Sequence, residues 1–256
     1  MQHIVAHILR EPELASYRVA IIGDLHIAPW RSTRPLARSM DIINASAPDL
    51  VALVGDYGHS ASSVPAFSRA CYRAILPRVA GELSRLRARH GVCAVLGNHD
   101  LDAGAEMVEH ALSGAGIRVL RDSHHDISHH GACLRVLGLD DITRHDVGPG
   151  VLRDKLLRGP AATLVLSHHP DLALRSGPLA PASPVLIVAG HTHGGQIAFP
   201  WLGAPVTLSR VATHDFPAGF VPNENTALYI TRGLGEQVPL RVRAPREITL
   251  LELAVR

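Results

Sequence analysis

The sequence contains little of what marks a membrane or exported protein. Aromatic residues make up only 4% of its 256 residues, and lysine occurs once, at Lys155. No uninterrupted apolar run approaches the ~18 residues that a spanning helix needs. Residues 1–10 also lack the basic segment and long apolar stretch of an export signal. We therefore expect a cytoplasmic protein without a transmembrane segment, while contact with the membrane periphery stays open.

Cysteine and net charge are low as well. Cys71, Cys93 and Cys133 form an odd set without a Cys-x-x-Cys pair, which argues against a disulfide framework and favours a reducing compartment. The formal net charge is only +2, and the pI is about 8.6. So mild an excess gives no strong attraction to nucleic acid, and we expect no nucleic-acid partner.

The length and composition predict one α/β domain over residues 1–256. The hydrophobic fraction of 46% is ample for its core. Five short apolar runs have the length and composition of fully buried strands: Arg18–Ile22, Leu50–Val54, Val92–Leu96, Thr163–Leu166 and Val185–Ala189. Further strands are expected at Ile117–Leu120, Cys133–Leu139, Ala227–Thr231 and Ile248–Leu253.

Helical patterns separate the earlier strands. A first helix is indicated by apolar residues at i, i+4 and i+7, namely Leu36, Met40 and Ile43. A second begins near Phe67, and we expect Pro77 to kink or end it. A third covers 107–112 and stops at the glycines around Gly114 and Gly116. This order predicts two sheets packed face to face with helices outside.

Each of the five buried-strand candidates ends in a polar cluster. The clusters are Gly23-Asp24-Leu25-His26, Gly55-Asp56, Gly97-Asn98-His99-Asp100, Ser167-His168-His169-Pro170-Asp171 and Gly190-His191-Thr192-His193. Ligand sites of open α/β sheets lie outside the carboxyl ends of the strands, so we expect these clusters to converge. Taken alone, the clusters at Asp24 and Asp56 most often occur by chance or mark a turn. All five clusters together favour a functional site.

The residue types in these clusters predict a two-metal centre. Asp, His and Asn without cysteine suit Mn, Fe, Zn or a mixed pair. Two cations roughly 3.5–4 Å apart need a bridging carboxylate and commonly hold a hydroxide between them. Asp56, alone at its strand end, is the natural bridge. His99 is placed to protonate a leaving alkoxide or to stabilise phosphoryl oxygens.

The ordered clusters closely resemble the signature of the calcineurin-like metallophosphoesterase family, over about residues 17–253. The resemblance implies a four-layer αββα sandwich, of two mixed β-sheets flanked by helices, with a dinuclear site at its loop edge. It implies a first metal, Mn²⁺, Fe²⁺/Fe³⁺ or Zn²⁺, held by Asp24, His26 and His193. The second metal would be held by Asn98, His168 and His191, with Asp56 as the bridge and His99 near the leaving group.

More narrowly, Ser167–Asp171, Gly190–Gln196 and Arg232–Thr249 resemble one bacterial branch of the family. Its members are often exported or membrane-anchored, and some act as phosphodiesterases or cleave the pyrophosphate of UDP-2,3-diacylglucosamine. The missing N-terminal anchor is one departure from that branch. His59 is another, because many members carry an acid there that orients the catalytic histidine. We expect Asp100 or water to take that role.

Other polar and aromatic residues near the clusters have structural explanations. An exposed hairpin, rather than another metal site, is expected to carry His124, His125, His129 and His130. Loop capping rather than pocket lining is expected for Asp140, Asp141 and His145, and His169 is expected to flank the site without binding metal. Pocket walls and core packing explain the two tryptophans, Trp30 and Trp201, equally well.

Substrate contacts are expected from Asn98, His99 and Arg232, whereas Arg31 and Arg34 are expected on the solvated surface. Specificity is expected to reside in loops, including Gly194–Pro205, Phe216–Pro222 and the wider stretch Gly203–Phe220.

The leading prediction is a dinuclear-metal-dependent hydrolase of a phosphomonoester, phosphodiester or pyrophosphate, in a small molecule or a lipid head group, acting through a metal-activated hydroxide. The alternatives are a nuclease and a non-catalytic, metal-bearing scaffold. The weak net charge argues against the nuclease, and the complete ligand set argues against the scaffold.

Overall fold

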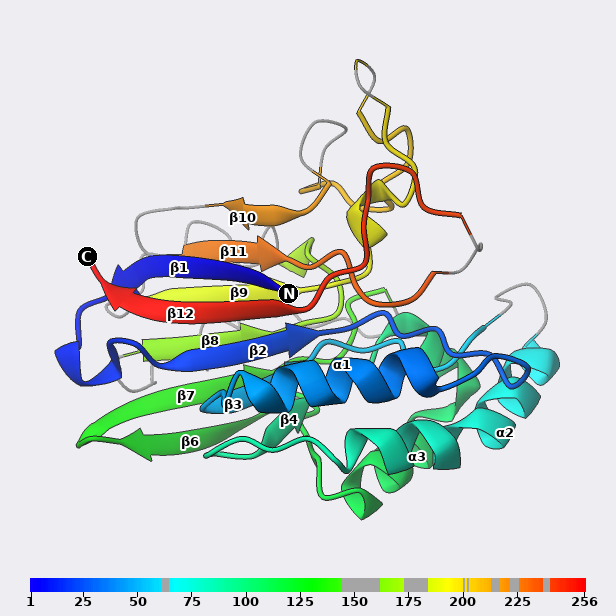
Figure 1. Ribbon diagram of the computed structural model, residues 1–256, viewed down its shortest axis with the longest axis horizontal. Helices are drawn as coiled ribbons and strands as arrows, with labels where there is room; N and C mark the ends of the chain where they lie inside the picture. The colour runs from blue at the N-terminus through cyan, green and yellow to red at the C-terminus, as the bar shows by residue number, and fades with distance from the viewer. Residues whose placement is uncertain are drawn as a thin grey trace.

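Two six-stranded mixed sheets pack face to face, with three helices on the outer side of the first sheet (Figure 1). The computed structural model describes residues 1–60, 65–143, 162–172, 184–199, 201, 203–212, 217–221, 226–236 and 240–256. The predicted α/β class with two mixed sheets and flanking helices is confirmed.

The first sheet has one antiparallel pair, β12 with β2, and is otherwise parallel. Its order is β1 (Gln2–Leu9), β12 (Thr249–Val255), β2 (Arg18–Ile22), β3 (Leu50–Leu53), β4 (Val92–Ala94) and β5 (Arg118–Val119). The second sheet is parallel inside and antiparallel at both edges. Its order is β10 (Gly219–Val221), β11 (Thr226–Ile230), β9 (Val185–Ala189), β8 (Ala162–Leu166), β7 (Ala132–Gly138) and β6 (Ser123–His129).

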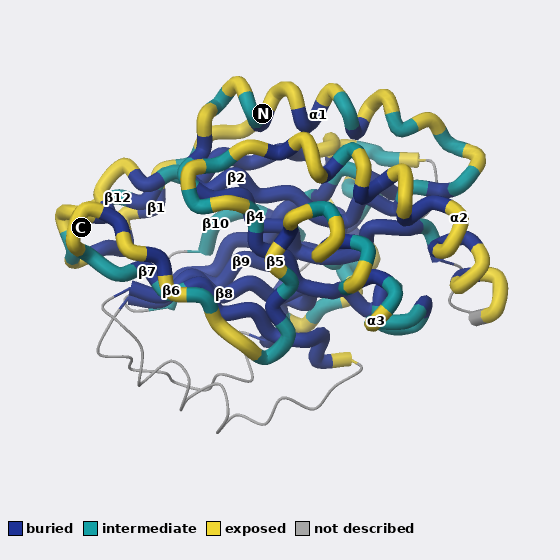
Figure 2. Tube along the Cα trace, turned by 90° about the horizontal axis from the view of Figure 1, so that it is seen from below, coloured by how far each residue is buried: buried dark blue, intermediate teal, exposed yellow. Residues whose placement is uncertain are grey.

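The helices are α1 (Arg34–Ala45), α2 (Pro65–Leu83) and α3 (Asn98–Gly114), with short 3-10 turns η1 (Pro12–Leu14) and η2 (His193–Gly195). Alternate strand residues face opposite layers. In β2, Val19 and Ile21 enter the core between the sheets, whereas Ala20 and Ile22 face the helices. Figure 2 shows the central strands buried and the outer turns of the helices exposed. Burial on both faces explains why these strands read as continuous apolar runs.

The outer face of the second sheet is covered differently. Val211 and Ala212 from a long loop pack against it, together with Leu172. No described helix lies there, so the fourth layer of the predicted sandwich is not among the described residues. Nor is any described helix long and apolar enough to cross a membrane.

Pro77 does not end its helix, contrary to one of the two expected outcomes. Helix α2 runs from Pro65 to Leu83 as one element. Buried side chains on both sides of the proline, Tyr72 and Ile75 before it and Val79 and Leu83 after it, pack in the core beneath the helices. This packing outweighs the hydrogen bond that the proline nitrogen cannot donate.

Two strands were not predicted. Strand β1 pairs in parallel with β12, although its partner residues lie almost the whole chain away. Strand β10 falls inside Phe216–Pro222, which was expected to be a loop. Two predicted strands also end early, because β3 stops at Leu53 and β4 at Ala94, where the chain turns toward the candidate site.

Candidate metal centre

The polar clusters do converge at one edge of the two sheets. Strands β2, β3 and β4 are parallel neighbours, as are β8 and β9, so their carboxyl ends point the same way within each sheet. Contacts between side chains from both sheets then close a single group that contains all seven predicted ligands: Asp24, His26, Asp56, Asn98, His168, His191 and His193.

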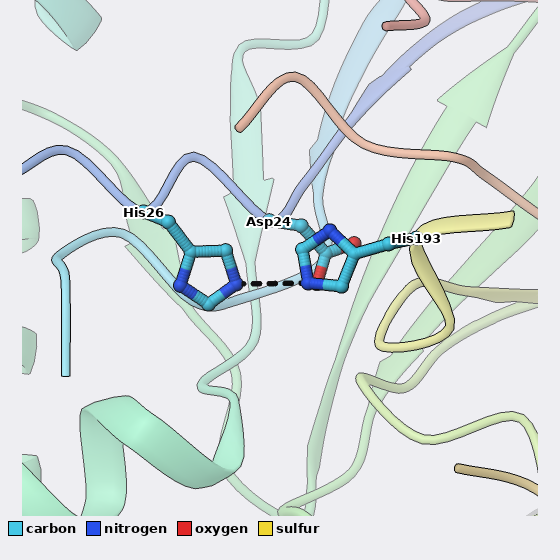
Figure 3. A group of neighbouring side chains, drawn as sticks. All are labelled: Asp24, His26 and His193. Carbon is cyan, nitrogen blue, oxygen red and sulfur yellow. Dashed lines mark hydrogen bonds and ion pairs between the residues drawn. The ribbon is translucent and has the colours of Figure 1, made fainter. Parts of the chain in front are cut away.

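The first part of the group contains Asp24, His26 and His193. The two Nε2 atoms of His26 and His193 lie 3.1 Å apart, and the Nε2 of His193 lies 3.9 Å from Asp24 Oδ1. Figure 3 shows the two rings facing one another, with the Asp24 carboxylate beside them. One potential ligand atom from each residue falls within 4.8 Å of the others. This is the trio that the resemblance assigns to the first metal.

The second part contains Asn98, His168 and His191. The Nε2 of His168 lies 3.1 Å from Asn98 Oδ1 and 3.2 Å from His191 Nδ1. Asn98 is the first residue of α3, and the histidines follow β8 and β9. The three side chains therefore come from three different elements and present one oxygen and two nitrogens to the same point.

Asp56 lies between the two parts. Its Oδ2 atom is 3.5 Å from His26 Nε2 and 3.2 Å from His168 Nε2. Both Asp56 and Asp24 are buried, with 2% and 0% of their surface exposed. A single carboxylate oxygen thus faces one imidazole from each trio, which is the position that a bridging ligand requires.

The donor set fits cations on chemical grounds. Burial lowers the pKa values of His26, His191 and His193, so these rings are neutral and have a lone pair to offer. The Nδ1–H of His168 donates to the Val54 carbonyl oxygen at 2.8 Å, which directs its Nε2 toward Asp56, where it can act as a ligand once it loses its proton. Buried carboxylates that face neutral imidazoles are stabilised by metal ions.

The chain also resembles known proteins. The sequence model of the family described as Calcineurin-like phosphoesterase matches residues 17–195, which is more than half of the chain. The chain belongs to this family. The chain is 28% identical to the uncharacterized metallophosphoesterase YkuE of Bacillus subtilis, and the match covers 98% of this chain and 84% of that protein. It is also 28% identical to the phosphodiesterase YaeI of Escherichia coli, over 93% of this chain and 83% of that protein.

Other similar proteins are longer than this chain, or resemble it in fold alone. A Danio rerio transmembrane protein with a metallophosphoesterase domain is 28% identical over 94% of this chain, which spans only 54% of that protein. A dimetal phosphatase structure, also from Danio rerio, superposes with a TM-score of 0.53 at 14% identity, covering 86% of this chain and 88% of that one. The predicted family and fold are confirmed.

The loops of this phosphoesterase family member hold the site residues in an unusual backbone conformation. Left-handed φ values occur at five of the seven predicted ligands, from 42° to 71°: Asp24, His26, Asp56, His191 and His193. Non-glycine residues adopt this region at a cost of order 1–3 kcal/mol each, and they persist there only where the surrounding structure holds them. Such strain concentrates at functional sites, in agreement with the placement of the ligands.

Asp100, one of the two candidates expected to orient His99, binds the backbone around Asp56. Its carboxylate accepts hydrogen bonds from the backbone N–H groups of Asp56, Gly97 and Tyr57 at 2.7–3.0 Å, and from the Tyr72 hydroxyl at 2.9 Å. Burial and the nearby Asp56 raise the pKa of Asp100 to about 7. Asp100 is thus a positioning residue for the backbone that presents Asp56.

His99 lies at the opening of the site. Its backbone N–H donates to Asp56 Oδ1 at 3.1 Å, and its Nε2 is 3.9 Å from Asp56 Oδ2. Nearby, the ring of His59 lies edge-on to Trp30, with 5.6 Å between ring centroids. Burial, together with Arg31 and His99, lowers the pKa of His59. The position that is often acidic in the family therefore carries a neutral imidazole here.

A cavity of about 420 Å³ leads outward from this centre. Its inner wall contains Asp56, His99, His191 and His193. Its outer wall is apolar and consists of Ile197, Phe199, Pro205, Val206 and Leu208, within the loop region where specificity was expected.

Two residues that support the site were not predicted. The Arg241 guanidinium lies 3.3 Å from His193 Nδ1 and donates to the His193 carbonyl oxygen at 3.2 Å. Glu236, with 5% of its surface exposed, accepts hydrogen bonds from Arg31 at 2.9 Å and from Arg246 at 2.7 Å. Both lie in loops without apolar periodicity, so no sequence signal indicated them.

Arg232, predicted as a substrate contact, forms an ion pair with Glu247. Arg34 is exposed, as expected, whereas the half-buried Arg31 pairs with the buried Glu236 instead of being solvated. Core packing is wrong for both tryptophans, because Trp30 is 66% and Trp201 is 95% exposed.

The remaining polar predictions hold only in part. Asp140 forms an ion pair with Arg121 at 2.7 Å, where loop capping was expected. Asp141 caps a turn, as expected, by accepting the Thr143 N–H at 2.8 Å. His169 flanks the site, with its ring centroid 4.3 Å from that of His191. The β6–β7 hairpin carries the other histidine cluster, but His129 is buried against Tyr17, with 7% of its surface exposed, where an exposed position was expected. His145 lies outside the described residues.

The pH dependence of metal affinity is a first prediction. Burial acts to lower the pKa of His168, but the Asp56 carboxylate outweighs it and raises this pKa well above the ordinary value. The metal must displace that proton, so the Mn²⁺ association constant should rise with pH above about pH 6.5, by up to about one logarithmic unit per pH unit. The imidazoles of His26, His191 and His193 are already neutral, so they add nothing to this dependence of the association constant on pH. Calorimetric titrations that give no slope, or a slope near three, contradict this.

Gly97→Ala should disturb the bridge directly. A Cβ at Gly97 would lie 2.2 Å from Asp56 Oδ1, although the backbone φ of −92° suits alanine. Displacing the bridging carboxylate by a fraction of an ångström or more should lower kcat/KM about a hundredfold. Gly81→Ala is the matched control, because nothing lies within 4 Å of its Cβ position in α2. The control should keep full activity and gain about 0.5–1 kcal/mol in stability. Equal activities of the two variants would refute the prediction.

Proposed function

We propose that this chain is a dinuclear-metal-dependent phosphoesterase that hydrolyses a phosphodiester bond. The observation that carries the proposal is the position of Asp56 Oδ2 between the two ligand trios. Asp24, His26 and His193 would hold one metal, and Asn98, His168 and His191 the other. When bound, two such cations supply Lewis acidity that activates water and neutralises phosphoryl charge. The oxygen- and nitrogen-rich donor set supports Mn or Fe.

His99 has the position of a general acid. It lines the cavity beside Asp56, with 12% of its side chain exposed, so a substrate oxygen can reach its Nε2. An imidazole there would donate a proton to the leaving-group oxygen as the P–O bond breaks. The apolar outer wall supports a substrate with an apolar substituent beyond the phosphate, as in a lipid head group. The name of the relative YaeI, a phosphodiesterase, agrees with this bond type.

The organisation of the chain supports one catalytic domain. Strands β1 and β12, from the two ends of the chain, pair in the same sheet whose other strands carry Asp24 and Asp56. Free thiols at Cys71, Cys93 and Cys133 support a reducing, cytoplasmic location.

The test is metal removal and replacement. Protein stripped with a chelator should not hydrolyse bis(p-nitrophenyl) phosphate, and Mn²⁺ or Fe²⁺ should restore the reaction. The diester should be hydrolysed faster than p-nitrophenyl phosphate. A reaction that is insensitive to chelation, or a failure of every first-row divalent metal to support hydrolysis of either ester, would show that the proposal is wrong.

A further inference from the structure

A small hairpin projects from the molecule directly beyond the metal centre. The loop that follows η2, in yellow, rises away from the two sheets in Figure 1. Phe199 and Gly203 close it through two backbone hydrogen bonds of 2.7 and 3.1 Å. Trp201, between these two residues, is 95% exposed. An indole held in water at the end of a projecting hairpin calls for an explanation, because burying an aromatic side chain is strongly favourable.

Exposed apolar side chains gather around this hairpin. Five of the eleven large exposed hydrophobic residues in the described chain come from residues 199–208 and the segment that pairs with them. They are Phe199, Trp201, Val206, Leu208 and Leu240, from 47% to 95% exposed, and are here called the apolar lobe. Such a concentration marks an interaction surface.

The flanks of the apolar lobe are basic. The segment 240–246 runs beside the hairpin, where Ala198 N–H donates to the Val242 carbonyl oxygen at 2.9 Å. Neither 195–213 nor 240–246 contains an aspartate or a glutamate. Arg210 and Arg243 in these segments are exposed, whereas Arg246, also exposed, is paired with Glu236. The surface is thus apolar at its tip and positively charged on its flanks.

We propose that the apolar lobe docks on an anionic phospholipid bilayer. Tryptophan favours the boundary between hydrocarbon and head groups, and arginines beside an inserted apolar surface bind acidic lipids. A stable protein partner needs about 800 Å² on each side, which suits a broad face better than the tip of a hairpin.

The lobe also continues into the site. Phe199, Val206 and Leu208 belong both to the lobe and to the wall of the cavity that reaches Asp56 and His99. When the lobe is docked, the apolar part of a membrane lipid could therefore enter the cavity along this wall. That last step rests on the proposed function, whereas docking itself does not.

The two tryptophans allow a direct test, because the chain contains no others. In Trp30→Phe, Trp201 is the sole reporter, and its emission should shift to the blue on mixing with phosphatidylcholine vesicles that contain phosphatidylglycerol. The single-tryptophan variant Trp201→Phe, which keeps Trp30, should show a much smaller shift. All measurements contain chelator, so binding does not require the metal centre.

Sedimentation with the same vesicles gives the magnitude. Trp201→Ala should weaken partitioning about ten- to a hundredfold. Ile42→Ala, which truncates a residue of α1 that is 44% exposed, should leave partitioning unchanged. Arg243→Gln should weaken binding to the anionic vesicles alone.

The proposal is overturned if the wild-type protein does not bind anionic vesicles, or if Trp201→Ala binds them equally well. It is also overturned if the protein forms a dimer that Trp201→Ala dissociates, because a second copy would then cover the lobe. Vesicle binding without hydrolysis of a soluble ester would defeat only the proposed function.

Discussion

Asp56→Asn is expected to lower phosphodiester hydrolysis by at least about 10⁴-fold, the largest effect of any single substitution. The carboxylate provides the negative charge between the two ligand trios, and its Oδ2 lies within 3.5 Å of an imidazole nitrogen from each. An amide of the same shape has one neutral oxygen and cannot bridge two cations. Metal content measured on the same preparation should fall below two ions per chain.

The control for this variant is Asp140→Asn. Asp140 is also buried, with 4% of its surface exposed, but its partner is Arg121 rather than a candidate ligand. Loss of that ion pair should cost stability, visible in thermal unfolding, while metal content and activity per folded molecule stay within a few-fold of the wild type. If Asp56→Asn retains both metals and more than about a tenth of the activity, Asp56 is not the bridge.

His99→Gln should lower kcat by about 10²–10⁴-fold for a diester with an alkyl leaving group, while both metals stay bound. The side chain lies 3.9 Å from Asp56 Oδ2 at the mouth of the site and is not among the seven ligands. For a p-nitrophenyl ester the loss should be much smaller, because that leaving group departs without a proton. This dependence on the leaving group separates proton donation from a merely structural role.

His110→Gln is the matched control, since it replaces an exposed histidine on the same helix, α3. It should match the wild type with both esters. Equal losses for the alkyl and nitrophenyl esters in His99→Gln would show that His99 stabilises phosphoryl oxygens instead. Loss of metal in that variant would make His99 a ligand, contrary to the assignment proposed for it.

The candidate site could be located from the sequence because its residues follow short apolar runs. The runs ending at Ile22 and Ala189 became central strands buried on both faces, and parallel pairing aligned each with the carboxyl end of its neighbour in its own sheet. The contact of His26 with His193, which are 167 positions apart, requires the face-to-face packing of the two sheets and has no local signal.

What could not be predicted depends on long-range contacts and backbone conformation. Strand β1 has one strand partner, β12, almost the whole chain away, so local pattern alone did not identify it. Left-handed φ values at Asp24 and His191 are imposed by surrounding contacts, such as the His191 N–H that donates to the Asp24 carboxylate. The hydrogen bonds of Asp100 could not be predicted either, because its partners, apart from Gly97, are not its neighbours in sequence.

Anomalous diffraction from Mn²⁺-loaded crystals tests the central claim most directly. We expect two peaks roughly 3.5–4 Å apart on either side of Asp56 Oδ2, one against His26 and His193 and the other against Asn98 and His168. A single peak, or peaks that leave Asp56 outside the coordination sphere of either ion, would contradict the two-metal account.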